Sequence, residues 1–552
     1  MLGIPTVTIA KTELGSGEEA INVTLTVDIS MLSFTPRHLV VRINGQHDGA
    51  DDGAYLRLNG DTGSNYNWQT LEGTGTTETA GRTSDNTSGV KIYKTDDEAS
   101  IFGGGEWLLP DALSTRTHKN VIGTGGQGET YGAWYSFGRW ANTAAITSVT
   151  CKVSDGTAGW AEGSTFELCV VDEDYAISGA EDILSGSQSG FSQTGITAGT
   201  GNLVCIGNLR SDRASNLADG LKLHYNSDTT SGNYYMQRLY GSGTDETGSA
   251  ANEDVGFTTT AATADASSFS AFLYTIPNYS DGSNDRNALA MSALHASSSS
   301  SYCMYHARSW NNTAGITAIS LIPEQGSNFV ANSMFSLYRI PGDSDDLIER
   351  IELGEDTTTI NFDSIPADYD HLEITAYLRA DRSSTAHGCE LYVNDDKVDA
   401  NHAAQYITAT GTTVFGNAYT SWPGNVQVQA DSSTANQFSV HVITAYNYKK
   451  TDRHKHIMVH SGYNDQGSTE DRVDLVSKRW KSTAAIHTLT IDPVGSPPIK
   501  FLAGSTAELR GISNDIPVPS DVEKVNGIEL GNIEDFNNIT VANAEKLNTI
   551  TF

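Results

Sequence analysis

Arg139-Trp-Ala-Asn-Thr-Ala-Ala-Ile146 is the stretch that decides how this chain is organised, because it occurs three times at one interval. It returns as Ser309-Trp-Asn-Asn-Thr-Ala-Gly-Ile316 and again as Arg479-Trp-Lys-Ser-Thr-Ala-Ala-Ile486, and successive tryptophans are 170 residues apart (310 − 140 and 480 − 310). Solenoid and propeller repeats have periods of roughly 20–50 residues. The longer period therefore indicates three copies of a whole domain.

A second landmark supports this register. The segment His371-Leu-Glu-Ile-Thr-Ala-Tyr-Leu-Arg-Ala-Asp-Arg382 has a counterpart 169 residues earlier (371 − 202), Asn202-Leu-Val-Cys-Ile-Gly-Asn-Leu-Arg-Ser-Asp-Arg213. The first copy has the same strand as His38-Leu-Val-Val-Arg-Ile43 but lacks the Arg-x-Asp-Arg ending. We expect that ending to be an ion-pair cluster that ties a strand end to a loop.

The spacing predicts domains at residues 1–178, 179–343 and 344–513, followed by a C-terminal segment, 514–552. About 170 residues is enough for each domain to bury a core of its own. We expect the three domains to follow one another in a row, as in a fibre, because tandem copies are typical of binding or structural arrays.

The composition and the apolar pattern predict an all-β fold. The chain has 53 Gly and 23 Tyr among 552 residues, and segments such as Phe269–Ile276 and Phe438–Ala445 carry apolar residues in strand-like runs. We predict three antiparallel β-sandwich domains of jelly-roll type, with eight to ten strands each. The polar stretches 73–90 and 240–265 are predicted to be projecting loops.

Charge and cysteine usage narrow the function. Asp and Glu outnumber Lys and Arg by 67 to 34, a net charge of −33, which would repel nucleic acid. The N-terminus lacks the basic and apolar regions of an export signal, and no apolar run is long enough to span a membrane. Five cysteines cannot all pair; Cys151, Cys205, Cys303 and Cys389 occupy positions typical of small core residues, and Cys169 lies on the opposite strand parity, which disfavours a Cys151–Cys169 disulfide. We therefore expect synthesis in the cytoplasm and no membrane insertion.

The tryptophans fall into two groups. Those in the repeated block, Trp140, Trp310 and Trp480, are predicted to be structural core residues, because a packing residue is kept wherever the fold is kept. The alternative for them is a sugar-stacking platform. The other candidates for glycan contact lie outside the repeated column and are Trp68, Trp107, Trp160 and Trp422.

Two clusters are candidate metal sites, although we predict no cofactor. His454, His456 and His460 have spacings that place them on one face of a strand, as a transition metal would need, but a solvated polar face is the simpler interpretation. The loop with Asn59, Asp61 and Asn65 offers oxygen atoms as a calcium loop does. A hairpin turn explains that loop equally well.

No catalytic residue is predicted. The sequence has no Gly-x-Ser-x-Gly elbow, Walker loop, Rossmann fingerprint, His-Glu-x-x-His or Cys-x-x-Cys motif. We therefore expect a protein that is not an enzyme. A glycosidase needs only two suitably placed carboxylates, which sequence cannot identify among 67 acidic residues, so a glycan-cleaving protein stays as an alternative.

The C-terminal segment repeats with a period of eleven residues: Lys524–Glu534, Asp535–Glu545 and Lys546–Phe552. Such a short segment cannot bury its apolar columns alone, so we expect it to mediate oligomerisation or attachment. Its β-branched and Asn-rich composition favours stacked strand-turn units over a helical supercoil. The predicted assembly residues are Val525, Ile528, Phe536, Ile539, Leu547 and Ile550.

Several of these segments resemble a module of structural proteins from tailed bacteriophages of marine and cyanobacterial hosts. The resemblance is carried by Tyr369–Arg382, Leu58–Tyr66, Arg479–Ile486 and Gly326–Tyr338, and it spans all three copies. It implies a virion structural protein: a surface appendage such as a tail fibre, a spike or a capsid-decorating head fibre.

This resemblance sets the expected location and partners. It implies a place on the virion surface, a homo-oligomer, expected to be a trimer, contact with other virion proteins, and a host-surface glycan as a candidate partner. The rival interpretation is a tandem carbohydrate-binding or glycan-cleaving protein.

Overall fold

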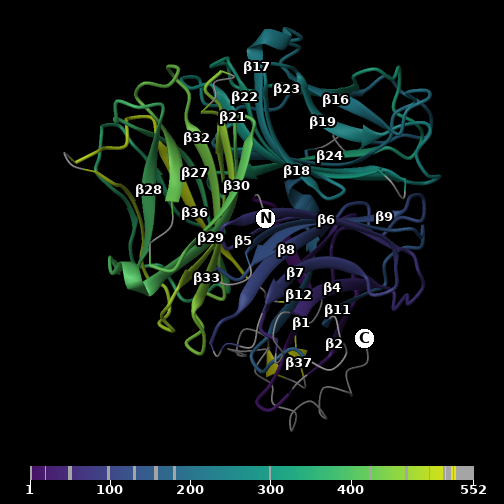
Figure 1. The fold of residues 1–552 in the computed structure, drawn as a ribbon, viewed down its shortest axis with the longest axis horizontal. Coiled ribbons are helices and arrows are strands. Elements are labelled where there is room, and N and C mark those ends of the chain that lie inside the picture. The colour runs from purple at the N-terminus through teal and green to yellow at the C-terminus, as the bar shows by residue number, and fades with distance from the viewer. Residues whose placement is uncertain are drawn as a thin grey trace.

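The computed structural model describes residues 3–18, 20–47, 52–95, 98, 100–128, 132–153, 159–177, 182–297, 300–421, 425–466, 470–495, 498–513, 516, 524–525 and 528–529. The described chain is all-β (Figure 1), and its only helical elements are 3-10 turns, η1 (Glu173–Tyr175), η2 (Ser231–Asn233) and η3 (Asp399–Asn401). No helix among these residues is long and apolar enough to cross a membrane.

The strands form three sets of twelve with one order. Repeat 1 contains β1 (Thr6–Glu13), β2 (Asn22–Thr26), β3 (Leu39–Gly45), β4 (Asp52–Leu58), β5 (Tyr66–Thr74), β6 (Thr77–Asn86), β7 (Val90–Thr95), β8 (Gly103–Leu109), β9 (Lys119–Gly126), β10 (Ala133–Trp140), β11 (Ser148–Val153) and β12 (Thr165–Val171). Repeat 2 contains β13 (Asp182–Ile183), β14 (Phe191–Thr194), β15 (Gly201–Leu209), β16 (Ala218–Tyr225), β17 (Tyr234–Ser242), β18 (Asp245–Ala251), β19 (Val255–Thr260), β20 (Ser270–Ile276), β21 (Arg286–Ser297), β22 (Ser300–Trp310), β23 (Ala318–Pro323) and β24 (Met334–Pro341). Repeat 3 contains β25 (Leu347–Glu352), β26 (Ile360–Phe362), β27 (His371–Ala380), β28 (Ala386–Val393), β29 (His402–Thr410), β30 (Thr413–Tyr419), β31 (Asn425–Ala430), β32 (Ser439–Tyr446), β33 (Lys455–Tyr463), β34 (Arg472–Trp480), β35 (Leu489–Pro493) and β36 (Thr506–Ile512).

Each repeat has a large and a small sheet. In repeat 1 the large sheet runs β1-β12-β3-β8-β9-β10-β5-β6 and the small sheet β2-β11-β4-β7, and repeat 2 has the same order with the equivalent strands. In repeat 3 the two sheets are joined by a short parallel pairing between β27 and β31. All the other pairings between strands are antiparallel within the described chain.

The two sheets of a repeat pack face to face as a β-sandwich. In repeat 1, Leu25 and Leu56 from the small sheet share one core with Val41 and Trp107 from the large sheet, and none of the four is more than 2% exposed. Side chains of a strand alternate between its two faces, so every second residue of these strands enters this core.

The other face of each large sheet is buried too. Along β10, Trp134 enters the sandwich core, whereas Tyr135 and Phe137 enter a central core that holds residues of all three repeats. Equivalent leucine and isoleucine residues meet in this central core: Leu71, Leu239 and Ile407. Figure 1 shows the three repeats arranged around this common centre.

The same kind of backbone hydrogen bond occurs once at each of the three interfaces between repeats. The residue just before an inner strand (β9, β21 or β33) donates its N–H to the carbonyl oxygen of a turn residue in the next repeat, and that turn residue has a left-handed backbone with φ between 58° and 65°. The bonds run from His118 to Ser267 (3.0 Å), from Asp285 to Asn436 (2.9 Å) and from His454 to Ser100 (2.9 Å). They lead from repeat 1 to 2, from 2 to 3 and from 3 back to 1, so the repeats form a closed, pseudo-threefold ring.

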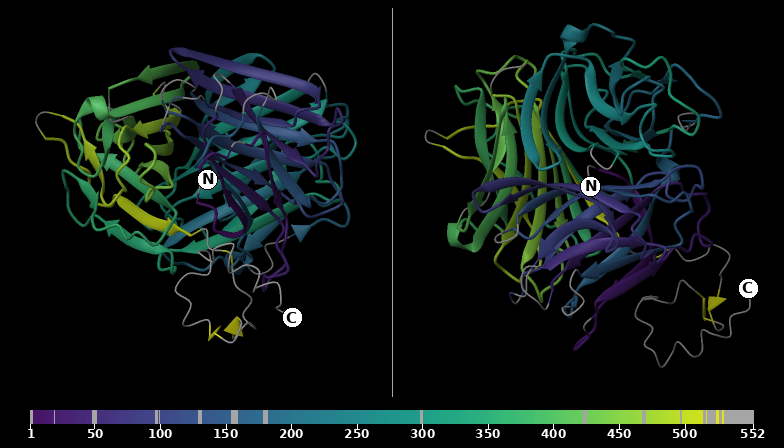
Figure 2. Two further views of the ribbon diagram at one scale, coloured as in Figure 1. Left: turned by 90° about the horizontal axis from the view of Figure 1, so that it is seen from below. Right: turned by 45° about the vertical axis from the view of Figure 1, so that its right-hand side comes forward.

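The expectation that the domains lie in a row is therefore wrong. A row would leave the second apolar face of each large sheet in water, whereas the ring covers all three at once. The start of the chain also reaches the third repeat, because the backbone N–H of Gly3 lies 3.3 Å from Oε2 of Glu373 in β27. The two further views of Figure 2 show the same packing of repeat against repeat.

The expected loops 73–90 and 240–265 are also mostly strands. They contain β6 in repeat 1 and β18 and β19 in repeat 2, which brings each repeat to twelve strands rather than eight to ten. β6 and β18 are polar edge strands whose side chains are largely exposed or half-buried, so they carry no apolar alternation. Their ladder hydrogen bonds and contacts between repeats hold them instead.

The tips of these hairpins interlock between repeats. Gln69 Nε2 donates to Gly243 O at 2.9 Å, and the equivalent Gln237 Nε2 donates to Gly411 O at 2.9 Å. Both glycines have positive φ (67° and 55°), a conformation that side-chain-bearing residues avoid. The hairpins therefore bind the ring together at one edge of the large sheets.

Substitution of Gly73 by alanine is predicted to weaken the ring. A Cβ at this position would lie 2.5 Å from the carbonyl oxygen of Tyr406 in another repeat, so two backbones must move apart. We expect Gly73→Ala to lower the free energy of unfolding by about 1–3 kcal/mol, measured by denaturant unfolding. Gly232→Ala is the control, because nothing lies within 4 Å of its Cβ, and equal stability of both variants would contradict the interlock.

Candidate functional site

The repeated tryptophan and the Asn/Asp loop form one motif in each repeat. Each indole is at most 4% exposed and donates its Nε1–H to an aspartate of the loop after β4, β16 or β28. The bonds are Trp140 to Asp61 (2.6 Å), Trp310 to Asp228 (2.9 Å) and Trp480 to Asp396 (2.8 Å). The motif thus pins a loop to the sandwich core.

The calcium candidates belong to this motif and are occupied by N–H donors. Asp61 accepts hydrogen bonds from the Gly63 backbone (2.7 Å) and from Asn65 Nδ2 (2.8 Å) in addition to the indole. Asn59 Oδ1 accepts from the Thr147 backbone at 2.7 Å. The positive ends of these donors lie where a cation would have to bind, so the loop is built as an indole anchor.

The histidine candidates lie in the interface between repeats and not on a solvated strand face. His456 is 1% exposed, stacks on Tyr446 (5.6 Å between ring centroids), and its Nε2 lies 2.9 Å from Ser477 Oγ. His460 is 2% exposed, and its Nε2 lies 3.2 Å from Thr124 Oγ1 of repeat 1. The expectation of a solvated face is wrong because β33 is an inner strand of the large sheet.

The third histidine, His454, donates its backbone N–H across the interface. No group of three or more His, Cys, Asp or Glu side chains among the described residues is arranged to hold a metal ion.

The tryptophan candidates for glycan contact are not exposed where they are described. Trp107 and Trp160 are both fully buried: Trp107 donates to Ser136 Oγ (2.8 Å), and Trp160 donates to the carbonyl oxygen of Cys151 (3.2 Å). Trp68 is half-buried beneath Lys91. Trp422 lies outside the described residues. Trp107 and Trp160 therefore cannot stack on a sugar, and they fill the first sandwich instead.

The Arg-x-Asp-Arg endings tie strand to loop mainly through hydrogen bonds to backbone atoms, and one ion pair is also present, between Arg213 and Asp219 at 3.6 Å. Arg210 donates to four backbone carbonyl oxygens, those of Ala262, Ala264, Asp265 and Ser268, at 2.8–3.3 Å. Arg379 binds the equivalent loop of repeat 3 in the same way. Each arginine shapes the turn whose carbonyl accepts the bond between repeats.

In repeat 1 the residue at the position of these arginines is Gln46, which donates to Glu98 O at 2.5 Å. This residue belongs to the copy whose sequence has lost the Arg-x-Asp-Arg ending.

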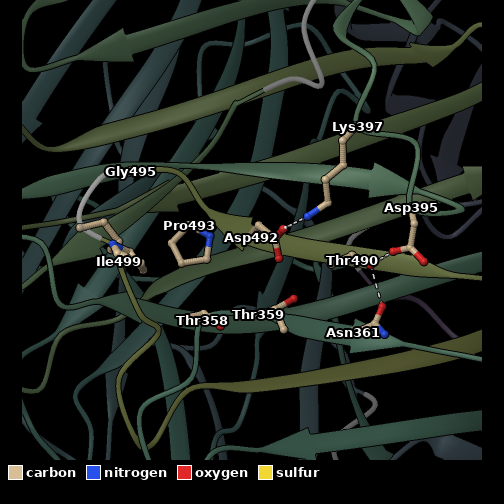
Figure 3. Close-up of a pocket in the computed structure, with 11 residues that line it drawn as sticks. Thr358, Thr359, Asn361, Asp395, Lys397, Thr490, Asp492, Pro493, Gly495 and Ile499 are labelled. Atoms are coloured by element: carbon tan, nitrogen blue, oxygen red, sulfur yellow. Dashed lines mark hydrogen bonds and ion pairs between the residues drawn. The ribbon is translucent and has the colours of Figure 1, made fainter.

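A polar groove of about 420 Å³ lies on the outer sheet of repeat 3 (Figure 3). Lys397 Nζ contacts Asp492 Oδ2 at 2.8 Å, and Thr490 Oγ1 donates to Asn361 Oδ1 at 2.6 Å. Asp395 Oδ1 lies 3.4 Å from the same hydroxyl. Sequence reasoning missed this site because its residues come from three segments far apart in the chain.

The assembly residues of the C-terminal segment fall mostly outside the described residues. Lys524–Val525 (β37) pairs antiparallel with Ile528–Glu529 (β38), with Val525 opposite Ile528. Phe536, Ile539, Leu547 and Ile550 are not among the described residues.

Comparisons with known proteins show no family for this chain. No family model and no curated protein matches it. Similar solved structures include the translocator domain of the autotransporter NalP from Neisseria meningitidis, with 7% identity and a TM-score of 0.09 over 84% of this chain and 91% of that chain. OpdK from Pseudomonas aeruginosa with vanillate has 8% identity and a TM-score of 0.11 over 82% of this chain and 98% of that chain. Another is a mutant of the GH43 protein BlXynB from Bacillus licheniformis, with 8% identity and a TM-score of 0.10 over 81% of this chain and 100% of that chain. At such TM-scores these similarities do not describe a shared fold.

Removal of one anchoring aspartate is predicted to destabilise the protein. Burial alone would raise the pKa of Asp228, but hydrogen bonds from Trp310 and Asn233 lower this pKa to about 2, so the carboxylate is charged and bonded. Asp228→Ala leaves a buried indole N–H without its acceptor, and we expect it to lower the free energy of unfolding by about 1–3 kcal/mol. The exposed Asp245→Ala is the control. A higher Tm of the wild type on adding calcium would contradict the anchor role.

Acid is predicted to weaken the protein through its buried histidines. Burial lowers the pKa of His38, His456 and His460 to about 3, well below 6.5. Between these values the unfolded chain binds protons that the folded chain does not, so stability falls as pH falls, by about 1.4 kcal/mol per pH unit for each histidine. Asp285, whose pKa burial raises to about 6, acts in the opposite sense. The measurement is urea unfolding of the wild type and of His460→Gln from pH 6.5 to 4.5. The free energy of unfolding should fall less steeply with falling pH in the variant, by about 1.4 kcal/mol per pH unit, because one buried histidine is gone. Identical slopes would contradict it.

Proposed function

We propose that this chain is a non-enzymatic structural protein of a tailed-phage virion: a rigid, pseudo-threefold body displayed at the virion surface as part of a fibre, a spike or a capsid decoration. The single observation that carries the proposal is the closed ring of three sandwiches. A body of this symmetry suits seating on a threefold or sixfold assembly, because equivalent surfaces then meet equivalent partners.

The use of the buried polar groups supports a structural role. Between repeats 3 and 1, His371 Nε2 lies 3.0 Å from Glu167 Oε2, and both side chains are at most 2% exposed. Within repeat 1, Arg42 and Glu106 form a buried ion pair, and Arg42 also donates to Thr6 Oγ1 at 2.6 Å. These buried polar groups are partnered: His371 and Glu167 link repeat 3 to repeat 1, whereas Arg42 and Glu106 fix β3 against β8 within repeat 1.

The pseudo-threefold ring changes what the C-terminal segment is proposed to do. Because the threefold arrangement is complete within one chain, association is not needed to cover the central core. We assign self-association, with a trimer as the first expectation, and attachment to other virion proteins to residues 514–552. The rival function, binding or cleavage of glycans through exposed tryptophans, is weakened for Trp107 and Trp160, which are fully buried.

Truncation after Ser513 separates the body from its assembly segment. We expect the truncated chain to keep the Tm of the full chain, because the contacts described for the ring lie within residues 3–513, and to scatter light as a single chain. The full chain, 59.0 kDa, should scatter as a multiple of that mass, and Ile528→Asp in the full chain should reduce the association. A monomeric full chain, or a truncated chain that still associates, would contradict this assignment.

A further inference from the structure

The groove on the outer sheet of repeat 3 is not required by the fold. Its ion pair, Lys397 with Asp492, occupies positions that other repeats fill with residues unable to form it. The strand pairings align these positions, which hold Thr62 and Lys152 in repeat 1 and Thr229 and Ile322 in repeat 2. Features that the sandwich needs, such as the Trp–Asp anchor, occur in all three repeats. The Lys397–Asp492 pair occurs in one repeat, so the sandwich fold does not explain it.

The groove is held in shape by the anchor beneath it. Asp395 and Lys397 flank Asp396, which accepts the indole N–H of Trp480 at 2.8 Å and Asn401 Nδ2 at 2.8 Å. The polar residues at the far side lie on paired strands, since Asn361 of β26 is opposite Thr490 of β35. A ligand would therefore meet groups that are already positioned, which reduces the entropic cost of binding.

The chemistry of the groove alternates donors and acceptors beside an apolar wall. Lys397 is 58% exposed on its side chain; its ammonium contacts Asp492 and lies 4.9 Å from the centre of the Tyr392 ring, and an ammonium has three N–H donors, so a donor remains for a ligand. Asp395 is exposed and offers carboxylate acceptors. Figure 3 shows Ile499 at the opposite end from Lys397 and Asp395. Ile499 and Pro493 are buried, so the exposed apolar residue of the groove is Pro498, next to Ile499 in the chain.

We propose that this groove binds a neutral saccharide. Each sugar hydroxyl both donates and accepts hydrogen bonds, as the alternating groups require, while a C–H face of the sugar can lie against the exposed ring of Pro498, which also lines the groove. The volume of about 420 Å³ lies within the range of small-ligand sites. Two carboxylates against one ammonium in the groove, on a chain of net charge −33, disfavour an anionic sugar. Binding itself does not depend on the proposed virion role; the inference rests on that role only in taking the saccharide to come from the host surface.

The test observes the isoleucine δ1-methyl groups by NMR while saccharides are added. The probes are neutral trisaccharides of glucose, galactose, mannose and N-acetylglucosamine, with a galacturonate trisaccharide as the anionic comparison, each at about 10 mM. At least one neutral probe should shift the Ile499 signal, which comes from the groove, and leave those of Ile146 and Ile316 in the other repeats unchanged.

Two variants show whether the groove itself binds. Lys397→Ala and Thr490→Val should each weaken binding at least about tenfold, whereas Lys152→Ala, at the equivalent place in repeat 1, should not change it. The proposal is overturned if no neutral probe shifts Ile499, if the two groove variants bind as the wild type does, or if galacturonate binds more tightly. None of these results would alter the light scattering of the full and truncated chains, so the assembly role would stand or fall separately.

Discussion

The structure depends on the burial of a second apolar face on each large sheet. A sandwich normally covers one face of a sheet and leaves the other to water, but here both faces of strands such as β10 are apolar. Two sandwiches stacked face to face would cover each other and leave the face of the third in water, whereas three in a ring cover all of them. Hydrophobic burial therefore selects the ring, and the Gly- and Tyr-rich inner strands are its consequence.

Burial alone does not orient the repeats, because it is not directional. The backbone bonds made by His118, Asp285 and His454 are directional and head-to-tail. One chain contains each interface once, so each has been free to diverge in its side chains. Asn120 and Asn287 donate to a carbonyl oxygen of the next repeat, whereas the equivalent residue at the third interface is His456. Diverged interfaces give each repeat a single correct neighbour on each side, which a homotrimer does not need.

The sequence predicts the all-β class and the internal repetition, because both are local or periodic signals. It does not predict the ring, since a face that packs on another repeat has the same composition as a face that packs within its own sandwich. It also cannot reveal β6 or β18, whose polar side chains carry no alternation. The link between Trp140 and Asp61 could have been found, because the same pair recurs in every copy at separations of 79, 82 and 84 residues.

Repetition within one chain also separates what the fold needs from what it does not. A contact present in all three repeats, such as indole to aspartate, is a requirement of the sandwich. A contact whose partner differs between interfaces, such as His371 with Glu167 at one and the equivalent His38 with Ser336 at another, belongs to the ring's specificity. A cluster present on one outer sheet, away from every interface, is required neither by the sandwich nor by the ring. Lys397, on the loop that the repeated anchor fixes, and Asp492 of β35 form such a cluster. Duplication of the domain has thus provided a stable frame on which one copy could acquire surface chemistry without loss of the ring.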